Sequence, residues 1–108
     1  MIALISDNKD AIAALCRQYG IRKLDVFGSA AIGEFDPDTS DLDFVVDLGG
    51  YEPGVSRRFF GFVWALEDLL GVSVNLLTED SIKNPYLREA IEEQRTRVYE
   101  AGDSQAVA

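Results

Sequence analysis

The sequence predicts an α+β, α/β-sandwich-like fold: a small mixed β-sheet with helices packed mainly on one of its faces. Its length of 108 residues, with 47% hydrophobic and 27% charged side chains, suits one globular domain with a single core. The spacing of its hydrophobic residues predicts elements in the order α-β-loop-β-α-β-α, and a final segment fits either a helix or a strand. We therefore expect one domain at residues 1–101 and a flexible tail at residues 102–108.

The first helix is expected at residues 7–19. Ser6 or Asp7 is suited to begin it as a cap, and Gly20 is suited to end it. Its apolar residues recur at helical spacing and form the stripe Ile12, Leu15, Cys16 and Tyr19. A single cysteine on such a stripe indicates an inert core residue.

Two strands follow, separated by a long turn-rich stretch. The first strand is expected at residues 24–27 and the second at residues 41–48, which Gly49 and Gly50 end. The intervening residues 28–40 are rich in glycine and acidic residues, with room for a short helical turn at residues 30–33.

The second half of the chain continues the alternation. A helix is expected at residues 57–70, closed by Gly71, and a strand at residues 72–77. A third helix follows and ends near Gln94.

The ends of this third helix leave two alternatives open. Ser81 or Asn84 can cap it, and Pro85 is suited to its first turn. Residues 96–100 either complete the helix or form a short edge strand, because periodicity alone does not separate the two.

Composition and charge exclude several classes of function. The net charge of −9 argues against a protein that binds nucleic-acid phosphates or an anionic membrane surface. The absence of histidine excludes imidazole bases and imidazole metal ligands, and one cysteine forms neither an internal disulfide nor a thiolate cluster. No apolar run approaches membrane-spanning length, so we expect a cytoplasmic protein. A nucleotide is still compatible with this charge, because a divalent cation inverts the local field.

One short segment carries the pattern of a chemical site. Asp41 and Asp43 are two residues apart on a strand, so their carboxylates point to the same side, roughly 7 Å apart. Two such oxygen donors suit Mg²⁺, although a lone Asp-x-Asp is also compatible with a strand face in water. Gly28 and Ser29 follow the preceding strand, where glycine allows close backbone approach to a phosphate and the serine hydroxyl can donate to it.

This combination resembles the signature of the polymerase-beta-type nucleotidyltransferases and, more narrowly, of the minimal nucleotidyltransferase (MNT) family. The similarity covers most of the chain. Its motif residues are Phe27-Gly28-Ser29, Gly33-Glu34, Ser40-Asp41-Leu42-Asp43 and the apolar run from Phe44 to Leu48.

The resemblance implies a nucleotidyltransferase fold, Mg²⁺, ATP or another nucleoside triphosphate, and transfer of a nucleotidyl group to an acceptor hydroxyl. Gly28, Ser29 and Ser40 would bind the nucleotide, while Asp41 and Asp43 would be the catalytic, metal-binding carboxylates. One of two ions would steady the leaving pyrophosphate and the other would lower the pKa of the attacking hydroxyl. Many MNT proteins are encoded beside a HEPN-domain protein and resemble MntA-like antitoxins that adenylylate a tyrosine of that toxin.

Three departures from the family pattern bear on activity. Asn75 stands where the family has a third metal-binding carboxylate, and its amide brings no charge. Ile32 stands where many relatives carry an arginine, and the loop before Asp41 is one residue longer than is usual. Two hypotheses follow: an active transferase, or an impaired antitoxin that binds its partner without transfer. A purely structural domain would leave the acid pair without a purpose.

Two other acids, Asp47 and Asp25, are candidates to replace the missing third carboxylate. Asp47 lies roughly 13 Å along the strand from Asp43, too far to share its ion. The orientation of Asp25 does not follow from the sequence, and we expect structural roles for both.

The second helix carries more apolar surface than one core face needs. Phe60 and Trp64 form a stripe beside the broad face Phe59, Phe62, Val63, Leu66, Leu69 and Leu70. They either pack under a neighbouring loop or form a contact surface for a partner or a homodimer.

Overall fold

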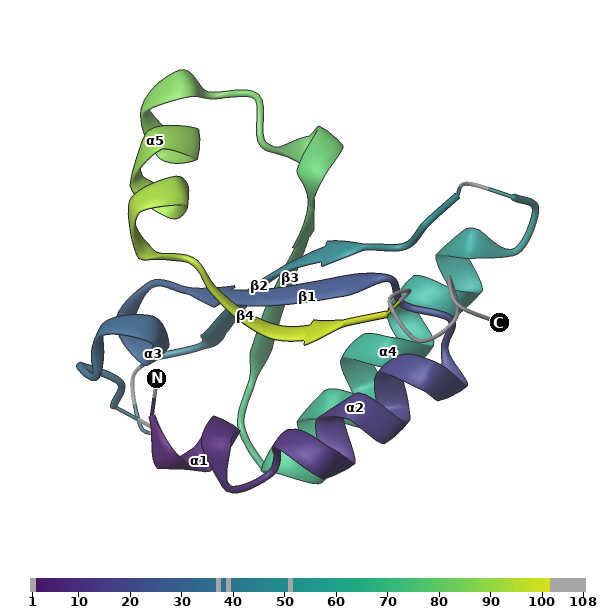
Figure 1. Ribbon diagram of the computed structural model, residues 1–108, viewed down its shortest axis with the longest axis horizontal. Coiled ribbons are helices and arrows are strands. Elements are labelled where there is room, and N and C mark those ends of the chain that lie inside the picture. Colours follow the sequence, from purple (N-terminus) through teal and green to yellow (C-terminus); the bar gives the residue numbers. More distant parts are fainter. Residues whose placement is uncertain (1, 37, 39, 51, 102–108) are drawn as a thin grey trace.

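The molecule is built on a four-stranded mixed sheet, seen in a computed structural model that describes residues 2–36, 38, 40–50 and 52–101 (Figure 1). The expected tail at residues 102–108 lies outside the described residues. Within them, no helix is long and apolar enough to cross a membrane.

The strands lie in the order β3-β2-β1-β4. Strand β1 (Lys23–Phe27) pairs antiparallel with β2 (Leu42–Asp47) and with β4 (Thr96–Glu100), whereas β2 and β3 (Val74–Thr78) are parallel. The sheet is therefore mixed, as predicted, and the three expected strands are found within two residues of their expected bounds. The final segment is an edge strand rather than the end of a helix.

Most helices cover one face of this sheet, which confirms the predicted arrangement. Figure 1 shows α1 (Ala3–Ser6), α2 (Lys9–Gln18) and α4 (Val55–Leu70) together below the sheet. Helix α5 (Pro85–Gln94) lies on the opposite side. The short α3 (Ser29–Ile32) follows β1, and a 3₁₀ turn η1 (Glu79–Ser81) follows β3.

The first helix differs from the expectation at its start. Helix α2 corresponds to the helix expected at residues 7–19, but its cap position is Asn8 instead of Ser6 or Asp7, and the separate one-turn helix α1 precedes it. The side chain of Asn8 does not cap α2; its Nδ2 donates to the carbonyl of Leu4 at 2.8 Å. The fully buried Ile5 anchors the extra turn in the core. Four residues are too few to show a helical period, so packing rather than pattern stabilises α1.

Asn84, not Ser81, caps α5. Its Oδ1 accepts hydrogen bonds from the amides of Tyr86 at 2.9 Å and Leu87 at 3.3 Å, and Pro85 occupies the first turn. At the end of α4, Gly71 has φ of +72°, the left-handed conformation that lets glycine close a helix.

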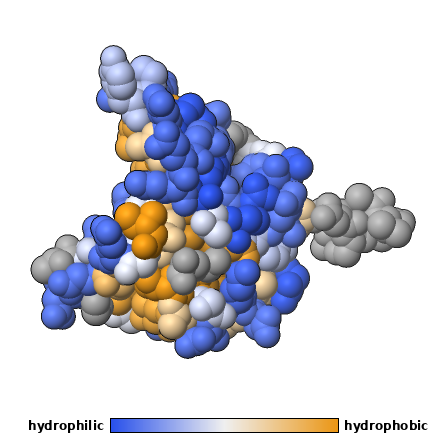
Figure 2. Space-filling view, turned by 60° about the vertical axis from the view of Figure 1, so that its left-hand side comes forward, coloured by the Kyte–Doolittle hydropathy of each residue, from blue (hydrophilic) through white to orange (hydrophobic). Residues whose placement is uncertain are grey.

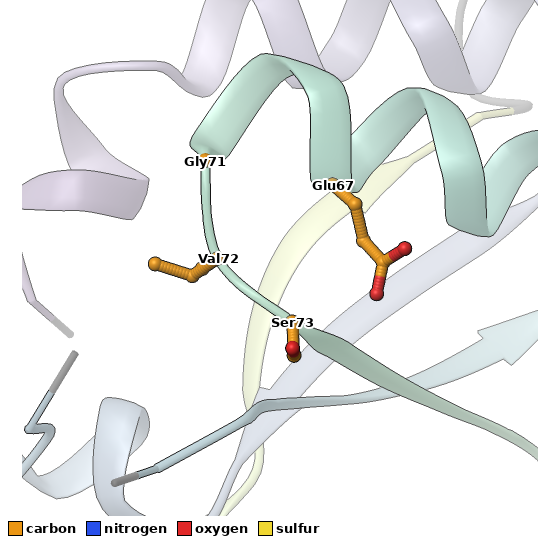
Figure 3. A pocket seen from close by; sticks show the side chains of 4 residues that line it. All are labelled: Glu67, Gly71, Val72 and Ser73. Carbon is orange, nitrogen blue, oxygen red and sulfur yellow. The ribbon is translucent and has the colours of Figure 1, made fainter. Parts of the chain in front are cut away.

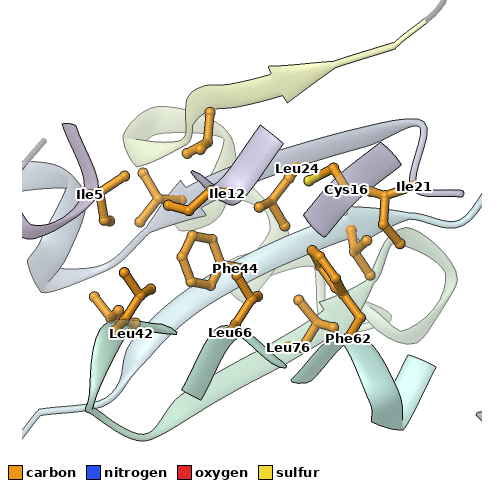
Figure 4. Close-up of a cluster of buried hydrophobic side chains, with 14 of the residues drawn as sticks. Ile5, Ile12, Cys16, Ile21, Leu24, Leu42, Phe44, Phe62, Leu66 and Leu76 are labelled. Atoms are coloured by element: carbon orange, nitrogen blue, oxygen red, sulfur yellow. The ribbon is translucent and has the colours of Figure 1, made fainter. Parts of the chain in front are cut away.

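The main core fills the space between the sheet and α1, α2 and α4 (Figure 4). Alternate residues of β1 and β2 enter it, because successive side chains of a strand point to opposite faces. These residues are Leu24, Val26, Leu42, Phe44 and Val46, and they pack with the buried side chains of Ile12, Cys16, Phe62 and Leu66. Burial raises the pKa of the Cys16 thiol to about 12, which confirms an inert core cysteine.

The opposite face of the sheet carries a smaller apolar cluster, formed by Phe27, Val45, Ile82 and Ile91. Figure 2 shows that the region of α5 presents mostly hydrophilic side chains, while hydrophobic side chains gather below it. Ion pairs supplement this cluster. The carboxylate of Asp25, only 3% exposed, accepts hydrogen bonds from Arg95 Nε at 2.8 Å and from Arg97. Asp25 is thus a structural residue that ties the end of α5 and β4 to β1.

The two phenylalanines Phe62 and Phe60 allow a matched test of this packing. Phe62 is fully buried between α4 and the sheet, whereas Phe60 on the same helix is 52% exposed. We expect Phe62→Ala to lower the free energy of unfolding by about 3–5 kcal/mol, because it removes buried area and leaves a cavity. Phe60→Ala should change it by less than about 1 kcal/mol. Urea unfolding measures both; equal losses would contradict the described packing.

Candidate active site

The start of β2 lies between two neighbouring strands, and this position assembles the candidate site. Asp43 is opposite Phe27 in the antiparallel ladder and opposite Asn75 in the parallel one. Its neighbours Leu42 and Phe44 point into the main core, so Asp43 points to the other face, the side on which α5 lies. The fold therefore brings Asp43 together with Gly28, which follows Phe27, and with Asn75.

Gly28 is in close contact with Asp43. Its φ of +71° is a conformation that L side chains rarely adopt. A Cβ added to Gly28 would lie 2.5 Å from Oδ2 of Asp43, so any side chain there would displace the carboxylate as well as strain the backbone. Glycine is therefore required for the backbone after β1 to reach the carboxylate.

The electrostatics of Asp43 indicate a site with excess negative charge. Burial raises the pKa of Asp43 above its ordinary value, and the charge of Asp41 acts in the same direction. A hydrogen bond from Asn75 Nδ2 to Asp43 Oδ1, at 3.1 Å, opposes this shift. The half-buried carboxylate thus lies beside a second acid, and the hydrogen-bond partner of its side chain among the described residues is the neutral amide of Asn75.

The donor set fits a hard divalent cation. Asp41 and Asp43 supply carboxylate oxygens, the ligands that Mg²⁺ prefers, and the amide oxygen of Asn75 is a possible neutral ligand. In the part of the chain that the structure describes, no group of three or more His, Cys, Asp or Glu is arranged to hold a metal. The set therefore has two acids and an amide, where the family pattern has three acids.

The two serines of the motif differ in their surroundings. Ser29 opens α3 directly after Gly28 and is half-buried. Ser40 precedes Asp41, and its Oγ accepts a long hydrogen bond of 3.4 Å from the amide of Asp36. The amide of Ser40 in turn donates to the carbonyl of Asp36 at 2.8 Å, so Ser40 closes the loop before β2.

Two further positions singled out in the sequence are Asp47 and Ile32. Asp47, at the far end of β2, accepts a hydrogen bond from the amide of Gly49 at 2.8 Å and so shapes the next turn. Ile32 is 53% exposed at the end of α3. Asp47 therefore has a structural contact, as expected.

Sequence reasoning missed Gln94, the last residue of α5. Its Oε1 accepts a hydrogen bond from the amide of Gly28 at 3.1 Å, although 66 positions separate the two residues. No short motif includes both, because only the folding of α5 over the sheet brings them together.

A pocket opens at the end of α4, beside the segment that leads into β3 (Figure 3). It has a volume of about 500 Å³ and is lined by Glu67, Gly71, Val72 and Ser73. The carbonyl of Ser73 accepts a hydrogen bond from the amide of Leu42 at 2.9 Å, which places the pocket next to the start of β2. Neither Asp41 nor Asp43 lines it, so it neighbours the acid pair without containing it.

The second aromatic stripe of α4 is exposed. Phe60 and Trp64 are 52% and 66% exposed, and their ring centroids lie 6.3 Å apart. The alternative that they pack under a loop is therefore wrong for the described residues. Leu69, expected on the core face, is 36% exposed and lies at its margin.

Comparison with known proteins agrees with the geometry of the acids. Residues 9–98 match the nucleotidyltransferase domain family. The chain is 39% identical to a protein named "Putative protein adenylyltransferase MJ1217" from Methanocaldococcus jannaschii, over 73% of this chain and 78% of that protein.

Solved structures share the same fold. A minimal nucleotidyltransferase is 34% identical, with a TM-score of 0.67, over 84% of this chain and 89% of that chain. A tri-AMPylated Shewanella oneidensis HEPN toxin in complex with MNT antitoxin gives a TM-score of 0.62 at 17% identity, over 95% of this chain and 78% of that chain. At that identity the likeness concerns the fold alone. Together with the acid pair at the start of β2, the match over residues 9–98 shows that the chain belongs to the nucleotidyltransferase domain family.

Proposed function

We propose that this protein is a Mg²⁺-dependent adenylyltransferase of the cytoplasm, acting as one domain at residues 1–101. It transfers AMP from ATP to a tyrosine hydroxyl of a HEPN-type toxin and so acts as its antitoxin. The observation that carries this proposal is the contact of Gly28 with Asp43, a residue of β2 that follows Asp41 by two positions. Two similarities support AMP as the transferred group and a HEPN-type toxin as the partner. One is to the adenylyltransferase relative MJ1217, and the other is to an MNT antitoxin in complex with an AMPylated HEPN toxin.

The proposed roles follow from the chemistry of each group. Asp41 and Asp43 would hold the cation, whose positive charge would balance the negative charges of the two carboxylates. A divalent cation held there would neutralise phosphate charge and lower the pKa of the acceptor hydroxyl. The amide of Gly28 and the hydroxyl of Ser29 would donate hydrogen bonds to phosphate oxygens. The tyrosine oxygen would bond to the α-phosphorus while the bond to pyrophosphate breaks, and the phenolic proton would leave to solvent.

Asn75 favours a second candidate function, an antitoxin that binds its partner without transferring AMP. Its side chain donates to Asp43 as a neutral partner, where a carboxylate would add a charged ligand. A site with one acid fewer binds a second cation less firmly. The protein would then inhibit the toxin by binding to it, without AMP transfer.

We further propose that Phe60 and Trp64 form the surface for the partner. Phe60 also lines an apolar pocket of about 250 Å³ together with Leu48, Val55, Ser56, Phe59 and Thr78. Exposed aromatic side chains beside an apolar pocket are typical anchors of protein interfaces. A homodimer on this surface is the alternative occupant.

The acid pair provides the first test of transfer. With ATP, Mg²⁺ and a HEPN-domain protein as the partner, we expect mass increases of one or more AMP units on the partner. Asp43→Asn should reduce this transfer by about 100-fold, because it removes a charged group at the reacting phosphate. Asp47→Asn is the matched control on the same strand, since its amide oxygen can still accept from Gly49. Binding and inhibition of the toxin without any mass increase would favour the second candidate.

Asn75→Asp tests the missing acid. The change adds a third carboxylate next to Asp43, so we expect Mg²⁺ affinity to rise on the order of tenfold and AMP transfer to increase. Without Mg²⁺ the new charge should raise the pKa of Asp43 further. A carboxylate whose pKa is raised by folding destabilises the protein as pH rises through that pKa, so the variant should unfold at a lower temperature at pH 7. Unchanged calorimetric affinity and unchanged turnover would show that Asn75 does not limit the site.

The aromatic surface is tested by association. Trp64→Asp should leave folding intact, because the side chain is 66% exposed, but should weaken the complex with the HEPN-domain protein by at least about tenfold. Tyr86→Asp is the control, since Tyr86 is an 82% exposed aromatic on α5. Light scattering with and without the partner measures both; loss of self-association alone in Trp64→Asp would identify a homodimer surface instead.

A further inference from the structure

Gln94 lies at the end of α5, on the face of the sheet to which Asp43 points. Val45, the next residue of β2 on that face, packs in the same cluster as Ile91 of α5. One turn after Ile91, the side chain of Gln94 reaches Gly28, and its Oε1 lies 3.1 Å from the amide nitrogen. Three elements therefore meet at this point: the end of β1, the start of β2 and the end of α5.

The hydrogen bond from Gly28 to Gln94 occupies a donor that the proposed function assigns to phosphate. Backbone amides beside a glycine turn bind phosphate by donating to its oxygens. An acceptor oxygen about 3 Å from the nitrogen is also the position that a bound phosphate oxygen would take. The side-chain oxygen Oε1 of Gln94 and a phosphate oxygen both carry negative partial charge, so the two cannot occupy that position together.

The end of α5 is held in place independently of Gln94. The guanidinium of Arg95, the next residue, pairs with Asp25 at 2.8 Å and also with Glu79 and Glu92. The side chain of Gln94 can therefore rotate away from Gly28 without displacement of the helix. Such a rotation breaks the hydrogen bond to the Gly28 amide.

We propose that Gln94 is a positioning residue that stands in for a phosphate oxygen: its side chain occupies the Gly28 amide in the nucleotide-free protein and yields it to the triphosphate. This inference rests on the proposed function, because it assumes that the Gly28 amide binds a nucleoside triphosphate. Gln94 keeps the half-buried amide paired and the turn in its binding conformation. It also lowers nucleotide affinity, because the internal hydrogen bond is lost when the ligand binds.

The predicted effect has a sign that a purely structural role would not give. Gln94→Ala leaves the Gly28 amide to water, so ATP no longer competes with an internal acceptor. We expect ATP, measured with Mg²⁺ by calorimetry, to bind about 2- to 10-fold more tightly than to the wild type. Gln94→Glu keeps an acceptor and adds negative charge, so it should bind ATP more weakly. Gln18→Ala is the matched control, because Gln18 is an exposed glutamine at the last position of α2.

The outcomes separate this inference from the proposed function. Failure of the wild type to bind ATP contradicts the proposed function itself. If the wild type binds and folded Gln94→Ala binds equally or more weakly, Gln94 is not a stand-in and the inference is overturned. If Gln94→Ala does not fold, Gln94→Glu decides: weaker binding supports the inference, and equal or tighter binding overturns it. In the amide NMR spectrum, the Gly28 signal should shift on adding ATP and, without ATP, in the Gln94→Ala protein.

Discussion

The contact between the Gly28 backbone and the Asp43 carboxylate depends on the register of three strands. Phe27, Asp43 and Asn75 lie opposite one another across β1, β2 and β3, so the turn after β1 and the acid on β2 reach the same point. A shift by one residue would turn Asp43 into the core, because strand side chains alternate. The apolar residues Leu42 and Phe44, fully buried on the other face, hold that register. The hydrophobic core thus positions the polar site.

The face that carries the site is held by different forces from the core face. A small apolar cluster packs α5 against the sheet, and ion pairs supplement it: the buried Asp25 carboxylate pairs with Arg95 and Arg97, and Glu79 pairs with Arg88. Removing one partner of such a buried pair is costly, so the network favours a single position of the helix end. That position in turn places Gln94 against Gly28. The ion pairs of Arg95 therefore hold the end of α5 where the Gln94 side chain reaches the Gly28 amide.

Asn75 shows a balance between electrostatics and binding. Beside Asp43, a third carboxylate would raise the repulsion that burial and Asp41 already create. The amide instead donates a hydrogen bond to Asp43 and relieves part of that cost. With asparagine instead of a carboxylate at position 75, a cation bound there would have one charged ligand fewer. The site is thus better neutralised without metal than a three-acid site, and weaker as a metal-binding site.

The sequence by itself determined the α+β class, the positions of β1, β2 and β3, and the acid pair, because these depend on short-range periodicity and on a motif of neighbouring residues. It left the cap of α5 open between Ser81 and Asn84, and the structure decided for Asn84. Only the tertiary structure decided the break between α1 and α2, the edge strand β4 and the contacts of Asp25 and Gln94. The partners in the last two contacts are 66 to 72 positions apart. Such pairs leave no local pattern, because they depend on how the whole fold places α5 and β4 beside β1.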